Sequence, residues 1–211
     1  MSIDRKLMRL YAVTDRTWLG GRNLTDDVEK ALKGGVTLLQ LREKDMNTED
    51  FIKSASKVKK VCQKYGVPLI INDNIAVAQA VDADGVHIGQ DDIPLSEARK
   101  VLGKGKIIGV TAKTISQAQK AENDGADYLG SGAVFGTSTK KNAKKIDIET
   151  LRSITLSVNI PVVAIGGITE ENILQLAGTG IAGAAVVSGI FAQSDIRKAS
   201  ENLFRKTGEI I

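Results

Sequence analysis

The feature that most constrains the fold of this chain is an alternation, repeated eight times, between short apolar runs and amphipathic helical segments. The apolar runs are rich in β-branched residues and are hydrophobic on both faces, which is typical of parallel strands covered by helices. They predict strands at residues 9–13, 37–41, 68–71, 85–88, 106–110, 128–131, 162–165 and 184–187.

The segments between these runs predict helices at residues 24–33, 48–65, 95–102, 115–123, 148–157, 173–177 and 196–206, and a weaker helix at 75–81. Thr25 is the expected cap of the first helix, and glycines at the joints provide the turns that end the helices. Eight strand–helix units in 211 residues predict one α/β domain over residues 1–211, a single (β/α)8 TIM barrel. An open, doubly wound sheet is the alternative.

Composition limits the chemistry. The chain has one cysteine, Cys62, and one histidine, His87, which excludes an internal disulfide and argues against a Cys/His zinc cluster. A catalytic triad would have to use His87. Aromatic residues make up only 4% of the chain, so no nucleic-acid partner is expected from the net charge of +4. Any chemistry must therefore depend on carboxylates, lysines, arginines, hydroxyls and a bound ion.

No membrane partner is expected. Residues 1–10 carry charges where a signal sequence would be apolar, and glycines interrupt the longest uncharged stretch, 178–194. That stretch is also shorter than the ~20 apolar residues of a membrane span. The expected location is cytoplasmic, and the sequence leaves the oligomeric state open, a homo-oligomer included.

Active sites of TIM barrels lie at the C-terminal ends of the strands, so polar residues at those positions are the candidates. After the second strand, Gln40, Arg42 and Lys44 fall on one face and would point into the barrel mouth. They are suitable donors to a phosphate chain, since arginine provides a fork and lysine a point charge. The alternative is a solvated strand end.

Carboxylates follow the next two strands. Asp73 and Asp92 are natural ligands for Mg²⁺, which binds a few hard oxygens and keeps water and phosphate in its other positions. Asp91 or Asp92 could instead cap the helix that follows Pro94. His87 is interpreted as a packed, hydrogen-bonded histidine rather than as a catalytic group.

The remaining strand ends supply hydroxyls and glycines. Thr111 lies at the fifth strand end, and the polar segment 137–140, followed by further lysines, comes after the sixth; the alternative for this segment is a solvated charge run. Gly166-Gly167 and Ser188-Gly189 follow the last two strands, where barrels commonly bind phosphate through bare amides. Two anionic groups on opposite sides of the mouth are therefore expected.

In this order along the chain, these residues resemble the thiamine-phosphate synthase family. The resemblance rests on the stretches 40–44, 71–73, 87–92, 135–140, 166–167 and 187–188 and covers almost the whole chain. It implies a TIM-barrel transferase that joins a hydroxymethylpyrimidine diphosphate to a thiazole phosphate and releases diphosphate. It also implies one Mg²⁺ per subunit, and small-molecule substrates as partners.

The resemblance assigns the site residues by position. For the pyrimidine diphosphate it implies Gln40, Leu41, Arg42, Glu43, Lys44, Asn72, Thr111 and Lys140, of which Arg42, Lys44, Thr111 and Lys140 are catalytic. For the thiazole phosphate it implies Thr137, Ser138, Thr139, Gly167, Val187 and Ser188, and for the metal Asp73 and Asp92. The family often has serine at position 111 and proline at position 136; Thr111 adds a methyl group, and Gly136 would make the loop more mobile.

Two rival functions remain. A thiazole tautomerase would need a proton-transfer residue and would have no use for the two aspartates or the diphosphate donors. A non-catalytic sensor of phosphate ligands on a barrel scaffold is the other rival, and release of diphosphate from the two substrates would distinguish it from an enzyme.

Overall fold

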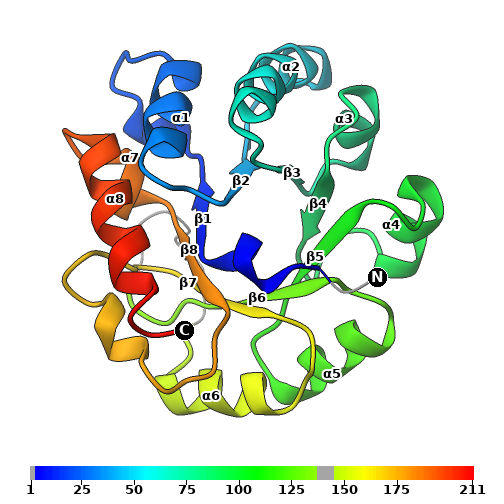
Figure 1. Ribbon diagram of the computed structural model, residues 1–211. Helices are drawn as coiled ribbons and strands as arrows, with labels where there is room; N and C mark the ends of the chain where they lie inside the picture. The colour runs from blue at the N-terminus through cyan, green and yellow to red at the C-terminus, as the bar shows by residue number, and fades with distance from the viewer. Residues whose placement is uncertain (1–2, 137–144) are drawn as a thin grey trace.

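The computed structural model describes residues 3–136 and 145–211. Within these residues, eight parallel strands close into a barrel in which each strand pairs with its neighbour in chain order. The last pairing joins β8 to β1, with Leu10 opposite Ala184. Figure 1 shows the helices arranged around this barrel. The predicted (β/α)8 barrel is confirmed, and because the sheet is closed, the open doubly wound alternative is wrong.

The strands are short and begin and end within one residue of the predicted positions. They are β1 Leu10–Val13, β2 Leu38–Leu41, β3 Leu69–Asn72, β4 Gly85–Ile88, β5 Ile107–Thr111, β6 Tyr128–Gly132, β7 Val162–Ile165 and β8 Gly183–Val186.

The α-helices of the described residues are α1 Leu24–Lys33, α2 Thr48–Tyr65, α3 Ile75–Ala80, α4 Leu95–Leu102, α5 Ile115–Asn123, α6 Ile148–Leu156, α7 Ser188–Phe191 and α8 Ile196–Thr207, with 3-10 turns η1 Arg5–Met8, η2 Arg16–Trp18 and η3 Ile173–Leu176. Seven of these eight α-helices lie where a helix or a weaker helix is predicted, and the exception is α7.

The structure differs from the prediction in three respects. Asn23, not Thr25, caps α1, because the Asn23 side chain accepts a hydrogen bond from the Thr25 main chain. The helix expected at 173–177 is a single 3-10 turn. The short helices η1, η2 and α7 were not predicted, since one turn is too short to show a helical period.

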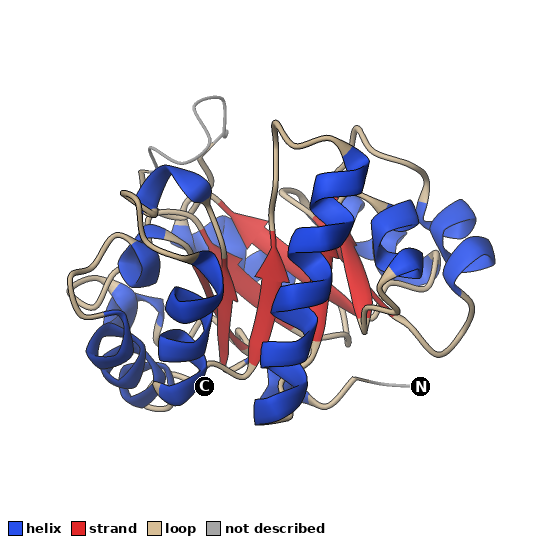
Figure 2. Cartoon of the chain, turned by 90° about the horizontal axis from the view of Figure 1, so that it is seen from above, coloured by secondary structure: helices blue, strands red, loops and turns tan. Residues whose placement is uncertain are grey.

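Figure 2 shows helices lying against the outside of the strands. Apolar side chains form two layers, one inside the barrel and one between the barrel and its helices. On β2, Leu38 belongs to the inner layer, while Leu39 and Leu41 belong to the outer one. This alternation places Gln40 on the inward side. The same alternation puts Asn72, His87 and Thr111 inward on their strands.

Carboxylates at the opposite, N-terminal end of the strands have structural partners. Asp84 accepts hydrogen bonds from Lys59 and from the main chain of Leu69, both at 2.7 Å. Asp127 accepts in the same way from Arg99 at 2.6 Å and from the main chain of Ile108 at 2.7 Å. These aspartates join neighbouring strands and helices, and they are distinct from the aspartates at the mouth.

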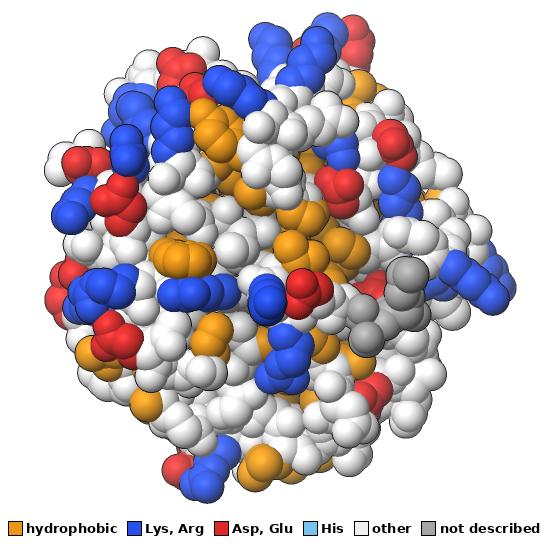
Figure 3. Space-filling view, in the orientation of Figure 1, with side chains coloured by type: hydrophobic (Ala, Val, Ile, Leu, Met, Phe, Trp, Pro, Cys, Tyr) orange, Lys and Arg blue, Asp and Glu red, His pale blue; other side chains and the backbone are white. Residues whose placement is uncertain are grey.

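The face shown in Figure 3 carries positive and negative side chains intermixed, with hydrophobic atoms between them. None of the helices in the described part of the chain is long and apolar enough to cross a membrane.

Candidate active site

A polar cavity of about 590 Å³ lies at the C-terminal ends of β1 and β2. Its lining includes Arg42, Glu43 and Lys44, which the sequence predicts, and Asp15 and Arg16, which it does not. In such a cavity the cationic groups can bind an anionic ligand, and the carboxylates can hold the cationic side chains in position.

Arg42 is held in a fixed position by the end of β1. Its Nη1 donates a 2.5 Å hydrogen bond to Asp15 Oδ2, and its main-chain nitrogen donates to Thr14 Oγ1 at 3.0 Å. The other Asp15 oxygen accepts from the main chain of Thr17 at 2.9 Å. Asp15 occupies, after β1, the same kind of rim position as the predicted residues after β2 to β4. Its position just after an apolar run is the feature of the sequence from which Asp15 could have been predicted as a site residue.

The two residues that follow or precede Arg42 have buried side chains. The Leu41 side chain is fully buried in the outer core, so only its main chain could contact a ligand. The Glu43 side chain is also buried and accepts a 2.6 Å hydrogen bond from Arg16 Nε. Glu43 Oε1 has no hydrogen-bond partner within residues 3–136 and 145–211.

Asp73 and Asp92 form an acidic pair at the ends of β3 and β4. Asp73 has a left-handed backbone, with φ of 60°, and its Oδ2 accepts from Asn72 Nδ2 at 2.6 Å and from Lys44 Nζ at 3.4 Å. Burial, followed by the facing Asp92 carboxyl group, raises the pKa of Asp73. The two carboxyl groups are therefore close enough to disfavour each other's ionisation.

The acidic pair has the donor chemistry that Mg²⁺ requires. Among the residues described, no group of three or more His, Cys, Asp and Glu side chains is placed to hold a metal ion. Two carboxylates fit an ion that takes its other oxygens from water and phosphate. Asp92 Oδ2 accepts from the Gly89 main chain at 2.7 Å, and the cap position of α4 is Pro94, which makes no side-chain cap bond. The alternative role of Asp91 or Asp92 as a helix cap is therefore wrong.

Gln40 lies inside the barrel, below the mouth into which the sequence predicts that it points. Its side chain is only 4% exposed, and its Nε2 donates a 2.5 Å hydrogen bond to Tyr11 Oη inside the barrel. Thr111 lies at the end of β5, with its Oγ1 3.0 Å from His87 Nε2. His87 Nδ1 is 3.0 Å from Tyr128 Oη, so the interpretation of His87 as a packed, hydrogen-bonded histidine is confirmed.

The ends of β7 and β8 form a second, glycine-rich region. Gly167 has φ of 68°, and a side chain there would overlap the Gly136 carbonyl and Phe135. The Gly167 carbonyl accepts from Asn172 Nδ2 at 2.8 Å. A side chain at Gly189 would lie 2.6 Å from the Ile168 carbonyl. The two loops therefore pack closely where Ile168, the residue after Gly167, meets Gly189, the residue after Ser188 at the start of α7.

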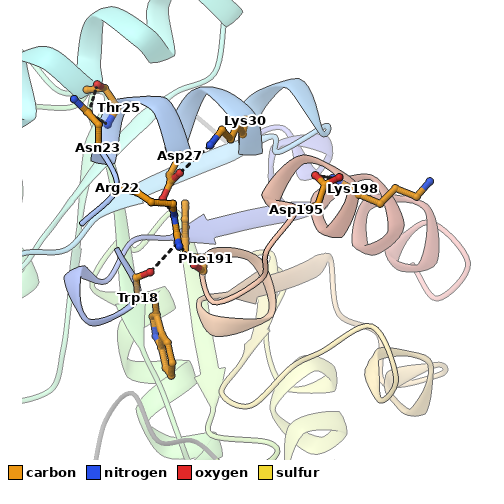
Figure 4. Close-up of polar contacts among 9 residues, drawn as sticks. All are labelled: Trp18, Arg22, Asn23, Thr25, Asp27, Lys30, Phe191, Asp195 and Lys198. Atoms are coloured by element: carbon orange, nitrogen blue, oxygen red, sulfur yellow. Dashed lines mark hydrogen bonds and ion pairs between the residues drawn. The ribbon is translucent and has the colours of Figure 1, made fainter. Parts of the chain in front are cut away.

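Arg22 ties this region to the loop after β1, as Figure 4 shows. Its Nη2 donates to the carbonyls of Trp18 at 2.7 Å and Phe191 at 2.9 Å, and its Nε donates to the fully buried Asp27 at 2.8 Å. Phe191 is the last residue of α7. The sequence gives no signal for this role, because Arg22 resembles an ordinary surface charge.

The site residues predicted at 137–140, which are Thr137, Ser138, Thr139 and Lys140, lie outside the described residues. The described residues place eight of the other candidates at the C-terminal ends of the strands. Arg42, Lys44, Asn72, Asp73 and Thr111 come from β2, β3 and β5 or follow them directly, while Gly167, Val187 and Ser188 follow β7 and β8. Fold and site together define a (β/α)8-barrel protein with a charged mouth at the C-terminal ends of its strands.

Comparison with known proteins identifies the family. Residues 10–190 match the family model described as thiamine monophosphate synthase. The chain is 53% identical over 196 residues to thiamine-phosphate synthase of Clostridium acetobutylicum, covering 93% of each chain. It is 50% identical over 209 residues to thiamine-phosphate synthase 2 of Streptococcus pneumoniae, covering 99% of this chain and 100% of that one.

Solved structures agree. Thiamine phosphate pyrophosphorylase from Pyrococcus furiosus superposes with a TM-score of 0.90 at 37% identity, over 98% of both chains. A geranylgeranylglyceryl phosphate synthase from Thermoplasma acidophilum, at 14% identity and a TM-score of 0.71, shares the fold alone. The chain belongs to the thiamine monophosphate synthase family and is an enzyme of the transferase class, as the sequence resemblance implied.

Proposed function

We propose that this enzyme joins 4-amino-2-methyl-5-(diphosphooxymethyl)pyrimidine to 4-methyl-5-(2-phosphooxyethyl)thiazole, giving thiamine phosphate and diphosphate in a Mg²⁺-dependent reaction. The observation that carries the proposal is the acidic pair Asp73 and Asp92 beside Lys44. A carboxylate pair next to a cation suits a metal-bound diphosphate, with the lysine contacting the phosphate oxygens directly.

The diphosphate side of the site is formed by β2, β3 and β5. Arg42 is already oriented by Asp15, so little side-chain freedom is lost when it binds an anion. Lys44 is half-exposed and bonds Asp73 at 3.4 Å, a contact long enough to be exchanged for a phosphate oxygen. Asn72 and Thr111 provide neutral donors. Lys140 is assigned to the same side by the family resemblance.

Asp73 and Asp92 would hold the magnesium ion. Bound there, it would supply positive charge against the negative charge that grows on the leaving diphosphate. The Asn72 amide donates to Asp73 and orients it, which is a common supporting arrangement for a ligating carboxylate.

The thiazole phosphate is assigned to the region around Gly167, Val187 and Ser188. A side chain at Gly167 would not fit between these loops, so this position can offer a ligand its main chain alone. The Ser188 hydroxyl adds a donor at the start of α7. Thr137, Ser138 and Thr139 are assigned to the same substrate by resemblance.

The bond changes need no general base. The bond between the pyrimidine methylene carbon and the diphosphate oxygen breaks, and its electron pair leaves with diphosphate. The electron-rich aminopyrimidine stabilises the resulting cation, which the lone pair of the thiazole nitrogen then attacks. The residues of this chain act by stabilising the charge on the leaving group. His87, which has hydrogen-bond partners inside the barrel, is not needed for proton transfer.

The test is release of diphosphate when the purified protein is mixed with both substrates and Mg²⁺. We expect release to require both substrates and to stop when EDTA removes the metal. Release without the thiazole phosphate would indicate hydrolysis instead of condensation. Binding of the ligands without turnover would support a sensor, and tautomerisation of a thiazole phosphate without diphosphate release would support a tautomerase.

A further inference from the structure

A chain of hydrogen bonds crosses the inside of the barrel from β2 to β5. Gln40 Nε2 lies 2.5 Å from Tyr11 Oη, and Tyr11 Oη lies 2.7 Å from Tyr128 Oη. Tyr128 Oη lies 3.0 Å from His87 Nδ1, and His87 Nε2 lies 3.0 Å from Thr111 Oγ1. The two ends of the chain, Gln40 and Thr111, are both assigned to the pyrimidine diphosphate, while the three residues between them have no assigned role.

Because Nε2 of Gln40, and not Oε1, faces Tyr11 Oη, the protons of this chain have one arrangement in which each donor has an acceptor. The Gln40 amide can only donate through Nε2, so Tyr11 Oη accepts from it. Tyr11 must then donate its own proton to Tyr128, because within the described residues its hydroxyl contacts only Gln40 and Tyr128. Tyr128 in turn donates to His87 Nδ1. His87 therefore carries its proton on Nε2 and donates it to Thr111 Oγ1.

The opposite direction is costly. If His87 donated from Nδ1 to Tyr128, then Tyr128 would donate to Tyr11, and the Tyr11 proton would have no acceptor. Tyr11 and Tyr128 are at most 1% exposed, and a buried donor without a partner is strongly disfavoured. Burial also raises the pKa of both tyrosines well above its ordinary value, so both keep their protons over the working range of an enzyme.

We propose that Tyr11, Tyr128 and His87 are positioning residues that make Thr111 an acceptor from His87 and so direct the Thr111 hydroxyl proton towards the bound pyrimidine diphosphate. The proposal rests on the assignment of Thr111 to that substrate. A threonine hydroxyl has one proton, and an incoming bond from His87 leaves that proton available for the ligand.

Glycines make room for this arrangement. A side chain at Gly109, on β5, would overlap the Tyr128 ring, and one at Gly130, on β6, would lie 3.1 Å from His87 Cε1. The rings of Tyr11 and Tyr128 pack edge to face, with centroids 5.8 Å apart. The glycines therefore leave room for the rings inside the barrel, and the packing of the rings fixes the positions of the two tyrosine hydroxyls.

The first measurement is the tautomer of His87, read from the ¹⁵N chemical shifts of the imidazole at one fixed pH. His87 is the only histidine of the chain, so its signals need no further assignment. We expect the Nε2–H form in the wild type and a mixture of tautomers in Tyr128→Phe, which keeps the ring and removes the hydroxyl. Tyr65→Phe on α2, whose hydroxyl bonds Glu29 outside the barrel, is the matched control and should leave the tautomer unchanged.

The second measurement is a double-mutant cycle on the affinity for the pyrimidine diphosphate. Tyr128→Phe should weaken binding about three- to tenfold, the range of one neutral hydrogen bond, and should leave the KM for the thiazole phosphate unchanged. In a Thr111→Val background the same substitution should have almost no further effect, because the two residues act as one unit.

His87→Gln and His87→Asn provide a second route if Tyr128→Phe folds poorly. A glutamine amide can reach the position of Nε2 and keep a donor beside Thr111, whereas an asparagine amide is too short. We expect His87→Gln to retain more affinity than His87→Asn. The proposal is overturned if the wild type shows the Nδ1–H form, or if the Tyr128 and Thr111 effects are additive. If the wild type does not bind the pyrimidine diphosphate at all, the proposed function fails, while the tautomer result still stands.

Discussion

The carboxylate of Asp15, at the end of β1, accepts a 2.5 Å hydrogen bond from the guanidinium of Arg42, at the end of β2, and both side chains are largely buried, with 9% and 17% exposed. This contact orients the only arginine assigned to the diphosphate. We therefore expect Asp15 to determine how well Arg42 can bind the diphosphate.

We expect Asp15→Asn to lower kcat/KM for the pyrimidine diphosphate about tenfold, and Arg42→Ala to lower it more. Each removes a charge-assisted hydrogen bond, worth about 1.5–3 kcal/mol. Steady-state kinetics with each substrate varied in turn provide the test. Arg197→Ala, which breaks an exposed pair on α8, is the control. Normal kinetics for Asp15→Asn would show that Arg42 does not need its partner.

Asp73→Asn and Asp92→Asn should each greatly reduce turnover and raise the Mg²⁺ concentration needed for half-maximal rate. Each substitution removes one ligand charge without changing the size of the side chain. Excess Mg²⁺ should restore part of the activity. Asp91→Asn changes an exposed neighbour and should have little effect. Unchanged metal dependence in either of the first two variants would contradict the metal assignment.

Ser188→Ala should raise the KM for the thiazole phosphate about tenfold and leave the KM for the pyrimidine diphosphate unchanged, since one hydrogen bond to an anion is lost. Arg42→Ala should have the opposite selectivity. Initial rates over a grid of both substrate concentrations separate the two effects. Equal changes for both substrates in both variants would argue against two separate anion sites.

A pyrimidine with trifluoromethyl in place of its ring methyl should react several factors of ten more slowly, although its diphosphate should bind similarly. The substituent withdraws electrons from the cation, and each factor of ten corresponds to ~1.4 kcal/mol of barrier. Single-turnover release of diphosphate with saturating thiazole phosphate is the measurement. Comparable rates for the two pyrimidines would exclude the dissociative mechanism.

The lowered pKa of Glu29 on α1 leads to a prediction of how the free energy of unfolding depends on pH. Hydrogen bonds from Lys64 at 2.7 Å and Tyr65 at 2.6 Å, both on α2, lower the pKa of Glu29 to about 2 from 4.5. A carboxylate with a lowered folded-state pKa stabilises the fold above its unfolded pKa, and this contribution is lost as the pH falls through the folded value.

Wild type should therefore be more stable than Glu29→Gln at pH 6, and the difference should shrink as the pH falls from 4.5 towards 2. Urea unfolding at several pH values measures this. Glu97→Gln, at an exposed position on α4, controls for the loss of a charge. A difference that does not change with pH would mean that the Glu29 contacts do not form in solution.

The barrel could be predicted from the sequence because its signal is local. Each strand is a short apolar run, and alternation along β2 places Gln40 inward without any knowledge of the other strands. The rim position of Asp73 and Asp92 follows from the same logic, since every strand of a parallel barrel ends on the same face.

The partners of these residues could not be predicted, because they depend on contacts between distant parts of the chain. Tyr11 and Tyr128 are separated by 117 positions and bond only because the barrel brings β1 and β6 to face each other across its interior. Arg22 bonds the Phe191 carbonyl, 169 positions away. Neither pair has a pattern in the local sequence, so periodicity alone could not find the hydrogen-bond chain or the anchor of α7.

The pairing of Leu10 with Ala184 has a consequence during synthesis of the chain on the ribosome. Until β8 has emerged, β1 and β7 each have an edge whose main-chain groups lack their final partner. Open edges of this kind can pair with other chains. The nascent protein therefore keeps two open strand edges until β8 leaves the exit tunnel. We expect chaperones that shield unpaired strands to bind translation intermediates that lack β8 and to release the chain once β8 has paired with β1.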